Sequence, residues 1–345
     1  MRATSGKAVL VALALAVTLA VAVWFGAAAS QSPFPLVPHP TSNAPMRQAL
    51  ENADYAEHLA ALQEIADGNG GNRTAGTSGY SASAEYVEEV LRDAGYAPVR
   101  QPFTFGHGRD AERIDSFNVL ADTAGDGAHT IVVGAHLDSV RDGPGINDNG
   151  SGVAAVLEIA RWVAASGGEL RNRVRFAFWG AEEDGLEGSK QYVEQLTDDE
   201  RDQTVLNLNI DMAGSPNGAR FVHDGDGSEF GGRPPEGSDQ IEKVFRDYFS
   251  AVELPVEATA FDGGSDYDAF QDAGIAVGGL FAGDVGMKSA TEAEEQGGEA
   301  GVAHDPCYHR SCDDVDNVDL DLVAEMAAAL GHATMAFAQG TPATQ

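Results

Sequence analysis

The first residues that could do chemistry are His136 and Asp138, which directly follow a short apolar run at 130–135. Asp148 comes twelve residues after His136. A metal-bound histidine usually donates its second ring N–H to a carboxylate, so a histidine followed two residues later by an acid is typical of a metal ligand and its orienting partner. The tripeptide alone carries little weight, because a chain with 54 acidic residues contains such spacings by chance.

Two adjacent carboxylates, Glu182 and Glu183, follow a second predicted strand, which ends at Trp179. Neighbouring carboxylates repel each other unless a cation or a shared proton is present. One interpretation is an exposed acidic loop. The other is a divalent metal ion held by one carboxylate, with the other free to carry protons. A third predicted strand, at 205–210, is followed directly by Asp211, and three successive strands that each lead into a candidate ligand favour the metal.

A fifth candidate ligand, His309, lies beside Tyr308 and between Cys307 and Cys312. The chain has two cysteines, and an even pair in an exported protein is expected to form a disulfide. We therefore predict a bond between Cys307 and Cys312. Its tight loop would hold the imidazole of His309 and the phenol of Tyr308 in place.

The candidate set contains two imidazoles and three or four carboxylates. Such a set has too many oxygens for one closed structural zinc and suits two zinc ions that share a carboxylate. Paired metals about 3.5 to 4 Å apart are a hydrolytic arrangement that occurs in aminopeptidases among other enzymes. The pattern therefore predicts a metallohydrolase.

The elements that must position these residues alternate between helices and strands. Apolar spacing predicts helices at 46–67, 81–94, 152–165, 186–196, 241–249 and 318–337, and strands at 98–105, 116–121, 130–135, 174–179, 205–210 and 276–281. From residue 130 onward this is the pattern of a largely parallel sheet. Because chemistry in such sheets collects at the carboxyl ends of the strands, the candidate ligands should meet at one edge.

The chain begins as exported proteins do. Arg2 and Lys7 precede an uncharged run at 8–25, and three alanines at 27–29 form a cleavage site. We expect a signal peptide at 1–29, a linker at 30–45 that contains most of the early prolines, a catalytic domain at 46–339 and a tail at 340–345. The apolar run has 18 residues, so an uncleaved anchor is the alternative. Otherwise we expect a secreted monomer without membrane contact.

The net charge of −33 excludes nucleic acid as a partner, because the phosphate backbone would be repelled. A solvated acidic surface is favoured over an acidic face for a cationic partner.

The motifs together resemble the secreted bacterial co-catalytic zinc aminopeptidases, in the clan that includes glutamate carboxypeptidase-like enzymes and animal-type glutaminyl cyclases. The similarity runs from about residue 56 to 337. It is carried by Gly70-Gly71-Asn72-Arg73, Gly134-Ala135-His136-Leu137-Asp138-Ser139-Val140, Gly145-Ile146-Asn147-Asp148-Asn149-Gly150-Ser151-Gly152, Trp179-Gly180-Ala181-Glu182-Glu183, Asn209-Ile210-Asp211-Met212, Val277-Gly278-Gly279-Leu280-Phe281 and Cys307-Tyr308-His309. The resemblance implies a single-domain, three-layer α/β fold with a largely parallel mixed sheet.

The resemblance also implies a role for each matched residue. One zinc ion would take His136 and Asp211, the other would take Glu183 and His309, and Asp148 would bridge them. Glu182 would be the general base that activates a bridging hydroxide, and Asp138 would orient His136. Tyr308 would donate a hydrogen bond to the carbonyl oxygen of the substrate. The peptide bond between Asp148 and Asn149 would be cis.

The implied substrates are peptides with a free α-amino group, which Glu182 and Asp211 would recognise. Met212 and Phe281 match positions that line an apolar pocket in relatives, which favours large apolar first residues; the alternative is that both are core residues. Gly264 stands where close relatives carry an arginine near the substrate. A calcium site that some relatives have is not recognisable in the closing helix, which leaves calcium binding open. The competing functions are a glutaminyl cyclase-like transferase, a carboxypeptidase of the clan and a non-catalytic binding domain.

Overall fold

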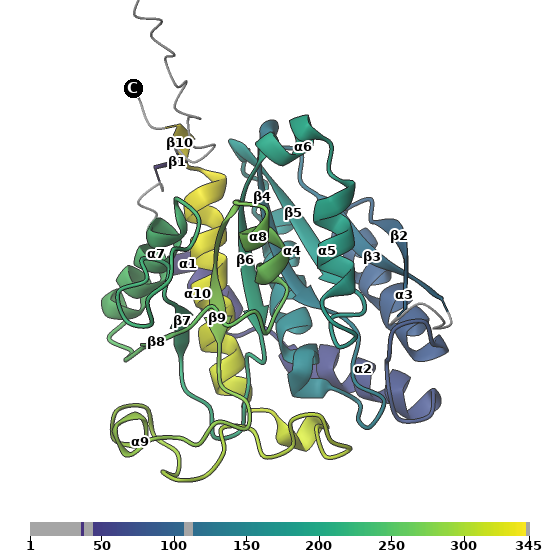
Figure 1. The fold of residues 1–345 in the computed structure, drawn as a ribbon, viewed down its shortest axis with the longest axis vertical. Helices are drawn as coiled ribbons and strands as arrows, with labels where there is room; N and C mark the ends of the chain where they lie inside the picture. Colours follow the sequence, from purple (N-terminus) through teal and green to yellow (C-terminus); the bar gives the residue numbers. More distant parts are fainter. Residues whose placement is uncertain (1–35, 38–43, 107–112, 343–345) are drawn as a thin grey trace, which may run out of the picture. The chain divides into compact units, whose positions relative to one another are not determined.

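The ligand-bearing strands belong to one mixed eight-stranded sheet (Figure 1). In a computed structural model that describes residues 36–37, 44–106 and 113–342, the strand order is β2-β3-β5-β4-β6-β9-β7-β8. The strands are β2 Val99–Phe105, β3 Ile114–Asp122, β4 Asp126–His136, β5 Asn172–Trp179, β6 Thr204–Asp211, β7 Phe221–His223, β8 Glu257–Thr259 and β9 Ala276–Phe281. The central strands β5, β4, β6 and β9 are parallel, whereas β3 pairs antiparallel with β5 and β7 pairs antiparallel with β9. The expected largely parallel mixed sheet is confirmed.

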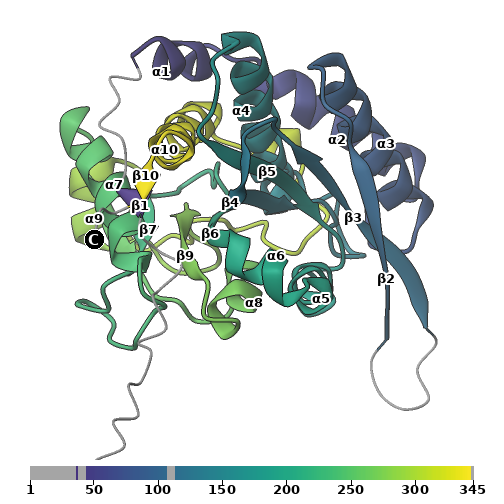
Figure 2. The same ribbon diagram turned by 90° about the horizontal axis from the view of Figure 1, so that it is seen from above.

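Helices cover both faces of the sheet. They are α1 Ala44–Glu51, α2 Tyr55–Gly68, α3 Ser78–Asp93, α4 Gly152–Ser166, α5 Glu187–Gln195, α6 Asp198–Gln203, α7 Ser238–Ala251, α8 Tyr267–Asp272, α9 Ala290–Gln296 and α10 Leu320–Ala338. Two short helical segments, η1 Ile146–Ser151 and η2 Val315–Asn317, lie near the strand ends. Figure 2 shows α4 and α10 on one side of the sheet and α5, α6 and α8 on the other, which makes three layers.

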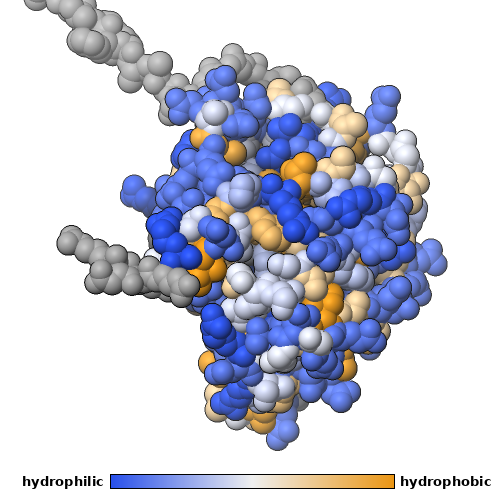
Figure 3. Space-filling view, turned by 90° about the vertical axis from the view of Figure 1, so that its right-hand side faces the viewer, coloured by the Kyte–Doolittle hydropathy of each residue, from blue (hydrophilic) through white to orange (hydrophobic). Residues whose placement is uncertain are grey.

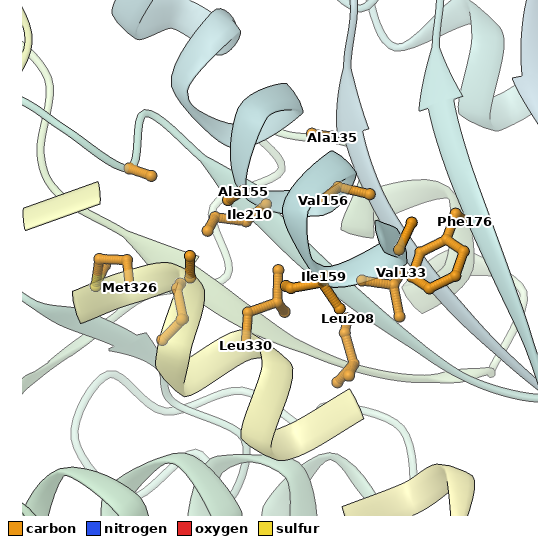
Figure 4. Close-up of a cluster of buried hydrophobic side chains, with 14 of the residues drawn as sticks. Val133, Ala135, Ala155, Val156, Ile159, Phe176, Leu208, Ile210, Met326 and Leu330 are labelled. Carbon is orange, nitrogen blue, oxygen red and sulfur yellow. The ribbon is translucent and has the colours of Figure 1, made fainter. Parts of the chain in front are cut away.

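Because successive side chains of a strand point to opposite faces of the sheet, the hydrophobic core has one part on each face. Ile131 and Val133 of β4 face the cluster that includes α4 and α10, whereas Val132 between them faces the cluster that includes α5 and α8. Figure 4 shows the larger cluster, in which Ile159 of α4 and Leu330 of α10 lie together with Val133. Burial on both faces explains why residues 131–135 of β4 form a continuous apolar run.

Several sequence expectations need correction. The single helix expected at 46–67 is two helices, because Asp54 caps a new one by accepting a hydrogen bond from the backbone N–H of Glu57. Helix α1 begins at Ala44, inside the segment expected to be a linker. The short elements α6, α8, α9, β7 and β8 were not expected, since each is too short to show a period.

The expected signal peptide at 1–29 lies outside the described residues, as do most of the linker and residues 343–345. The described residues all belong to one compact unit. Leu36–Val37 pair with Thr341–Pro342 as β1 and β10. Within the described residues, α10 alone has the length and apolar composition to cross a bilayer, but 72% of its apolar window is buried in the core. Figure 3 shows a face on which hydrophilic residues predominate, as the acidic composition indicates.

Candidate metal centre

Neighbouring parallel strands bring the candidate ligands to one edge of the sheet. His136 is the last residue of β4, Asp211 is the last residue of β6, and Glu183 follows β5 after a short turn. These strands lie side by side in the order β5, β4, β6, so their carboxyl ends meet. The chain between β9 and α10, which carries His309, runs past the same edge (Figure 1).

One cluster is centred on His136, which is almost fully buried. Its Nε2 lies 3.1 Å from Oδ1 of Asp148 and 3.4 Å from Oδ1 of Asp211. These three side chains could surround a single metal ion.

A second cluster is centred on His309. Its Nε2 lies 2.9 Å from Oε2 of Glu183 and 3.2 Å from Oδ2 of Asp148. The two oxygens of Asp148 therefore face different histidines. One carboxylate placed between two three-residue clusters is the arrangement expected of a ligand shared by two ions.

The donor atoms of these clusters fit a pair of metal ions. Oε1 of Glu183 and Oδ1 of Asp211 are buried and have no hydrogen-bond partner among the described residues. Buried carboxylate oxygens without a partner are costly, and cations are one of the few groups that can compensate such sites. Imidazole and carboxylate ligands together suit zinc.

Asp138 contacts both the backbone of the two glutamates and the ring of His136. It is fully buried, and its two oxygens accept hydrogen bonds from the backbone N–H groups of Glu182 at 3.1 Å and Glu183 at 3.3 Å. Its nearer oxygen lies 3.8 Å from Nδ1 of His136, whereas its backbone oxygen lies 3.3 Å from the same nitrogen. Asp138 thus holds the two glutamates through their backbone as well as lying behind His136. Burial raises the pKa of Asp138 to about 6.

The loop that carries His309 is closed by a Cys307–Cys312 disulfide, which confirms the predicted pairing. Within it, the ring of Tyr308 stacks on the ring of His309 with 3.8 Å between centroids. Backbone φ of His309 is 58°, a conformation that non-glycine residues rarely adopt. The loop therefore fixes both rings beside the two side-chain clusters. The peptide bond between Asp148 and Asn149 is cis, as the resemblance implied.

A cavity of about 140 Å³ opens beside the clusters. It is lined by Asp148, Glu182, Asp211, Met212, His223, Thr259, Ala260, Asp262, Gly264, Ser265, Tyr267, Phe281, Asp284, Tyr308 and His309. Met212 and Phe281 thus line the wall next to the candidate ligands, although Met212 is also mostly buried.

A comparison with protein families shows the family of the chain. Residues 118–334, more than half of the chain, match the model of peptidase family M28. The chain belongs to this family.

Curated relatives of this M28 chain include proteins named as aminopeptidases. It is 40% identical to leupeptin-inactivating enzyme 1 of Streptomyces exfoliatus over 88% of this chain and 66% of the relative. It is 46% identical to an aminopeptidase of Pseudomonas aeruginosa over 65% of this chain and 41% of the relative. It is 43% identical to the probable lipoprotein aminopeptidase LpqL of Mycobacterium tuberculosis over 82% of this chain and 58% of the relative. The chain thus spans 41% to 66% of the length of these relatives.

Solved structures share the fold at low identity. An aminopeptidase from Aneurinibacillus sp. strain AM-1 superposes with a TM-score of 0.66 at 18% identity, over 86% of this chain and 96% of that chain. A glutaminyl cyclase of Porphyromonas gingivalis gives a TM-score of 0.61 at 18% identity, over 83% and 99%. The M28 fold is thus common to hydrolytic and cyclising enzymes.

The electrostatics of the M28 site raise the pKa of both Glu182 and Glu183. Burial raises the pKa of Glu182 well above its usual range, and the negative neighbours Asp266 and Asp211 add to the effect of burial. Burial, with Asp148 nearby, raises the pKa of Glu183 to about 7. Cations bound at the clusters would offset this concentration of negative charge.

Sequence reasoning missed several residues that support the ligands. Ser265 donates to Oδ2 of Asp211 at 2.6 Å, and Asp313 accepts from the backbone N–H of Asp148 at 3.1 Å. Arg73, noted only as part of a motif, is fully buried and donates to the backbone oxygens of Leu137 and Gly145. Asp313 directly follows a cysteine that flanks a ligand, which could have drawn attention to it. Ser265 carries no such signal.

Proposed function

We propose that this M28 protein is a secreted two-zinc aminopeptidase that hydrolyses the first peptide bond of peptides with a free α-amino group. The observation that carries the proposal is the position of Asp148, whose two oxygens face His136 and His309 separately. Membership of a peptidase family and relatives named as aminopeptidases support the reaction class.

Five residues would hold the zinc ions. His136 and Asp211 would bind one, Glu183 and His309 would bind the other, and Asp148 would be shared. When bound, paired zinc ions polarise the substrate carbonyl and lower the pKa of a water molecule between them.

Glu182 belongs to neither cluster, yet it lines the cavity. Its carboxylate would take a proton from the attacking water and later deliver it to the leaving amine. The hydroxyl of Tyr308, on the same cavity wall, would donate a hydrogen bond to the substrate carbonyl oxygen as negative charge develops there.

Recognition of the substrate would use the rest of the cavity. The carboxylates of Glu182 and Asp211 would bind the α-ammonium group, which makes an unblocked N-terminus necessary. Met212 and Phe281 would contact the first side chain, which favours leucine, phenylalanine or methionine. Export would follow from the segment at 1–29.

The test uses purified protein that begins near Ser30. We expect about two zinc ions per chain by elemental analysis, release of free leucine from a leucyl peptide, and no product from the same peptide after N-acetylation. Chelation should abolish the activity and zinc should restore it. A cyclised product from an N-terminal glutamine peptide, a C-terminally shortened product, or full activity without metal would overturn the proposal.

A further inference from the structure

Two buried carboxylates, Asp305 and Asp313, lie at the two ends of the disulfide loop. Asp305 precedes Cys307 by two residues and Asp313 directly follows Cys312, and their exposed fractions are 0% and 1%. The hydrogen bonds that the structure gives these carboxylates come from neutral amide groups. A buried carboxylate that accepts hydrogen bonds only from neutral groups depends on these donors to remain in place.

Both carboxylates hold the segment that contains the shared ligand Asp148. Asp313 accepts from the backbone N–H of Asn147 at 2.8 Å and from that of Asp148 at 3.1 Å. Asp305 accepts from the side-chain amide of Asn147 at 2.7 Å and from the backbone N–H of Cys307 at 2.8 Å. The loop that carries His309 is therefore tied at both ends to the segment that carries Asp148.

The amide of Asn317 joins the two carboxylates. Its Nδ2 lies 3.0 and 3.1 Å from the oxygens of Asp305 and 3.2 Å from Oδ1 of Asp313. One amide NH₂ has two N–H groups, so it can serve both carboxylates at once. Without it, two buried negative groups would each lose a donor while remaining close enough to repel each other.

We propose that Asn317 is a positioning residue that sets the place of His309 relative to Asp148 and so controls zinc binding on the His309 side. Asn317 acts through Asp305 and Asp313; its hydrogen bonds in the structure are to these two residues and to Asp314. The inference rests on the proposed two-zinc function.

The test compares zinc binding by the parent and by Asn317→Ala, measured by competition with a chromophoric chelator. Loss of a residue that orients a ligand typically weakens metal affinity about 10- to 100-fold. We expect that weakening for one of the two zinc ions, while the other binds as in the parent. In a His309→Ala background, Asn317→Ala should have no further effect on zinc affinity, since both changes act on the same ion.

Asn172→Ala is the matched control. Asn172 is a buried asparagine at the start of β5, the end of the strand away from the site, and its amide donates to the backbone oxygens of Phe337 at 2.7 Å and Gly340 at 3.1 Å. Both variants should unfold at lower denaturant concentration than the parent, but only the Asn317 variant should lose zinc affinity. A purely structural role for Asn317 would not produce this difference.

Hydrogen exchange adds a readout that needs no metal. In chelator-treated protein, amides in residues 307–313 should exchange faster in Asn317→Ala than in the parent, and Asn172→Ala should leave them unchanged. If Asn317→Ala does not fold, Asn317→Ser, which keeps a small donor, takes its place. Unchanged affinity for both zinc ions, or equal loss of both, would overturn the inference and leave the two-zinc function standing. A parent that binds fewer than two zinc ions would overturn both.

Discussion

Ser265 donates a hydrogen bond of 2.6 Å to Oδ2 of Asp211. The bond leaves Oδ1 of Asp211 turned toward His136, 3.4 Å from its Nε2. The hydroxyl of Ser265 also accepts from Nδ2 of Asn209 at 2.9 Å, so its own orientation is fixed. A ligand carboxylate of the proposed zinc site is therefore oriented by a residue 54 positions away in the chain.

From this contact we predict that Ser265→Ala weakens zinc binding on the His136 side. The expected loss is about 10- to 100-fold in affinity, because Asp211 becomes free to rotate. Chelator competition on the purified variant measures it. Ser83→Ala is the control, since Ser83 is also fully buried but donates to the backbone oxygen of Gly79 within α3. Equal zinc affinities in the parent and Ser265→Ala would remove Ser265 from this role.

The positions of the strand-end residues could be predicted because each follows a predicted strand. The strands predicted at 174–179 and 205–210 are β5 and β6, extended by one or two residues. A parallel strand buried on both faces is mostly apolar, so a charged residue at its end is conspicuous even though β6 also holds the buried amides of Asn207 and Asn209. His136 and Asp211 were visible for this reason.

The residues that orient the ligands could not be predicted in the same way. Ser265 lies in a loop and Asn317 ends the three-residue helix η2, so neither belongs to an element long enough to show a period, and their partners are set by tertiary contacts rather than by local sequence. Helix α6 illustrates the same limit, because it has no buried residue and so leaves no apolar pattern. The residues that orient the candidate ligands could therefore be found only in the folded structure.

His223 predicts a dependence of stability on pH. Burial lowers the pKa of His223 from 6.5 to about 4, so the folded protein keeps it neutral. In the unfolded chain this histidine gains a proton as the pH falls below 6.5, whereas in the folded protein it gains a proton only near pH 4. The contribution of His223 to stability is therefore complete above pH 6.5 and is lost as the pH falls from 6.5 toward 4.

His223→Gln removes this titration. Between pH 7.5 and pH 5 the parent should lose about 2 kcal/mol more unfolding free energy than the variant, at 1.36 kcal/mol for each pH unit below 6.5. Denaturant unfolding at both pH values measures the difference. Other groups titrate in the same way in the parent and the variant, so their contributions to the unfolding free energy cancel in this comparison. Parallel losses in the two proteins would show that His223 does not titrate with this shift.

From the surroundings of Gly264 we predict that the charge of the cavity wall affects which second residue is preferred in a peptide substrate. It lines the cavity beside Asp262, and a Cβ added to Gly264 would lie 3.0 Å from Oδ1 of that residue. The cavity wall also carries Asp284, so peptides with a cationic second residue should be favoured over those with an anionic one. Gly264→Arg would place a positive charge there.

We expect Gly264→Arg to reduce the ratio of kcat/KM for Leu-Lys peptides over Leu-Glu peptides by about tenfold at low ionic strength. Unit charges about 6 Å apart in water interact by about 0.7 kcal/mol, so the arginine would disfavour the lysine peptide and favour the glutamate peptide by this amount each, and the ratio would change by about 1.4 kcal/mol. The difference should shrink in about 1 M salt. Asp199→Asn changes the net charge by the same amount at an exposed position in α6 and should leave the ratio unchanged. An unaltered ratio in Gly264→Arg would refute the role of this wall.

The same substitution, glutamate to glutamine, should affect different properties of the enzyme at the adjacent residues Glu182 and Glu183: turnover at the first and zinc affinity at the second. Oε2 of Glu183 lies 2.9 Å from Nε2 of His309, whereas Glu182 belongs to neither cluster and lines the cavity. Glutamine keeps the size and hydrogen-bonding reach of either side chain but is no longer a basic carboxylate, and the backbone N–H bonds of both residues to Asp138 would remain.

We predict that Glu182→Gln lowers kcat by about 100- to 10,000-fold, the range that general base catalysis supplies. Its zinc content should stay at the parental level, because the metal ligands are untouched. Glu183→Gln should instead bind zinc more weakly, and added zinc should restore part of its activity, which it cannot do for Glu182→Gln. Steady-state kinetics and elemental analysis of both variants separate these outcomes. Loss of zinc from Glu182→Gln with retention in Glu183→Gln would reverse the assignment, and near-parental turnover in Glu182→Gln would remove Glu182 from the chemistry.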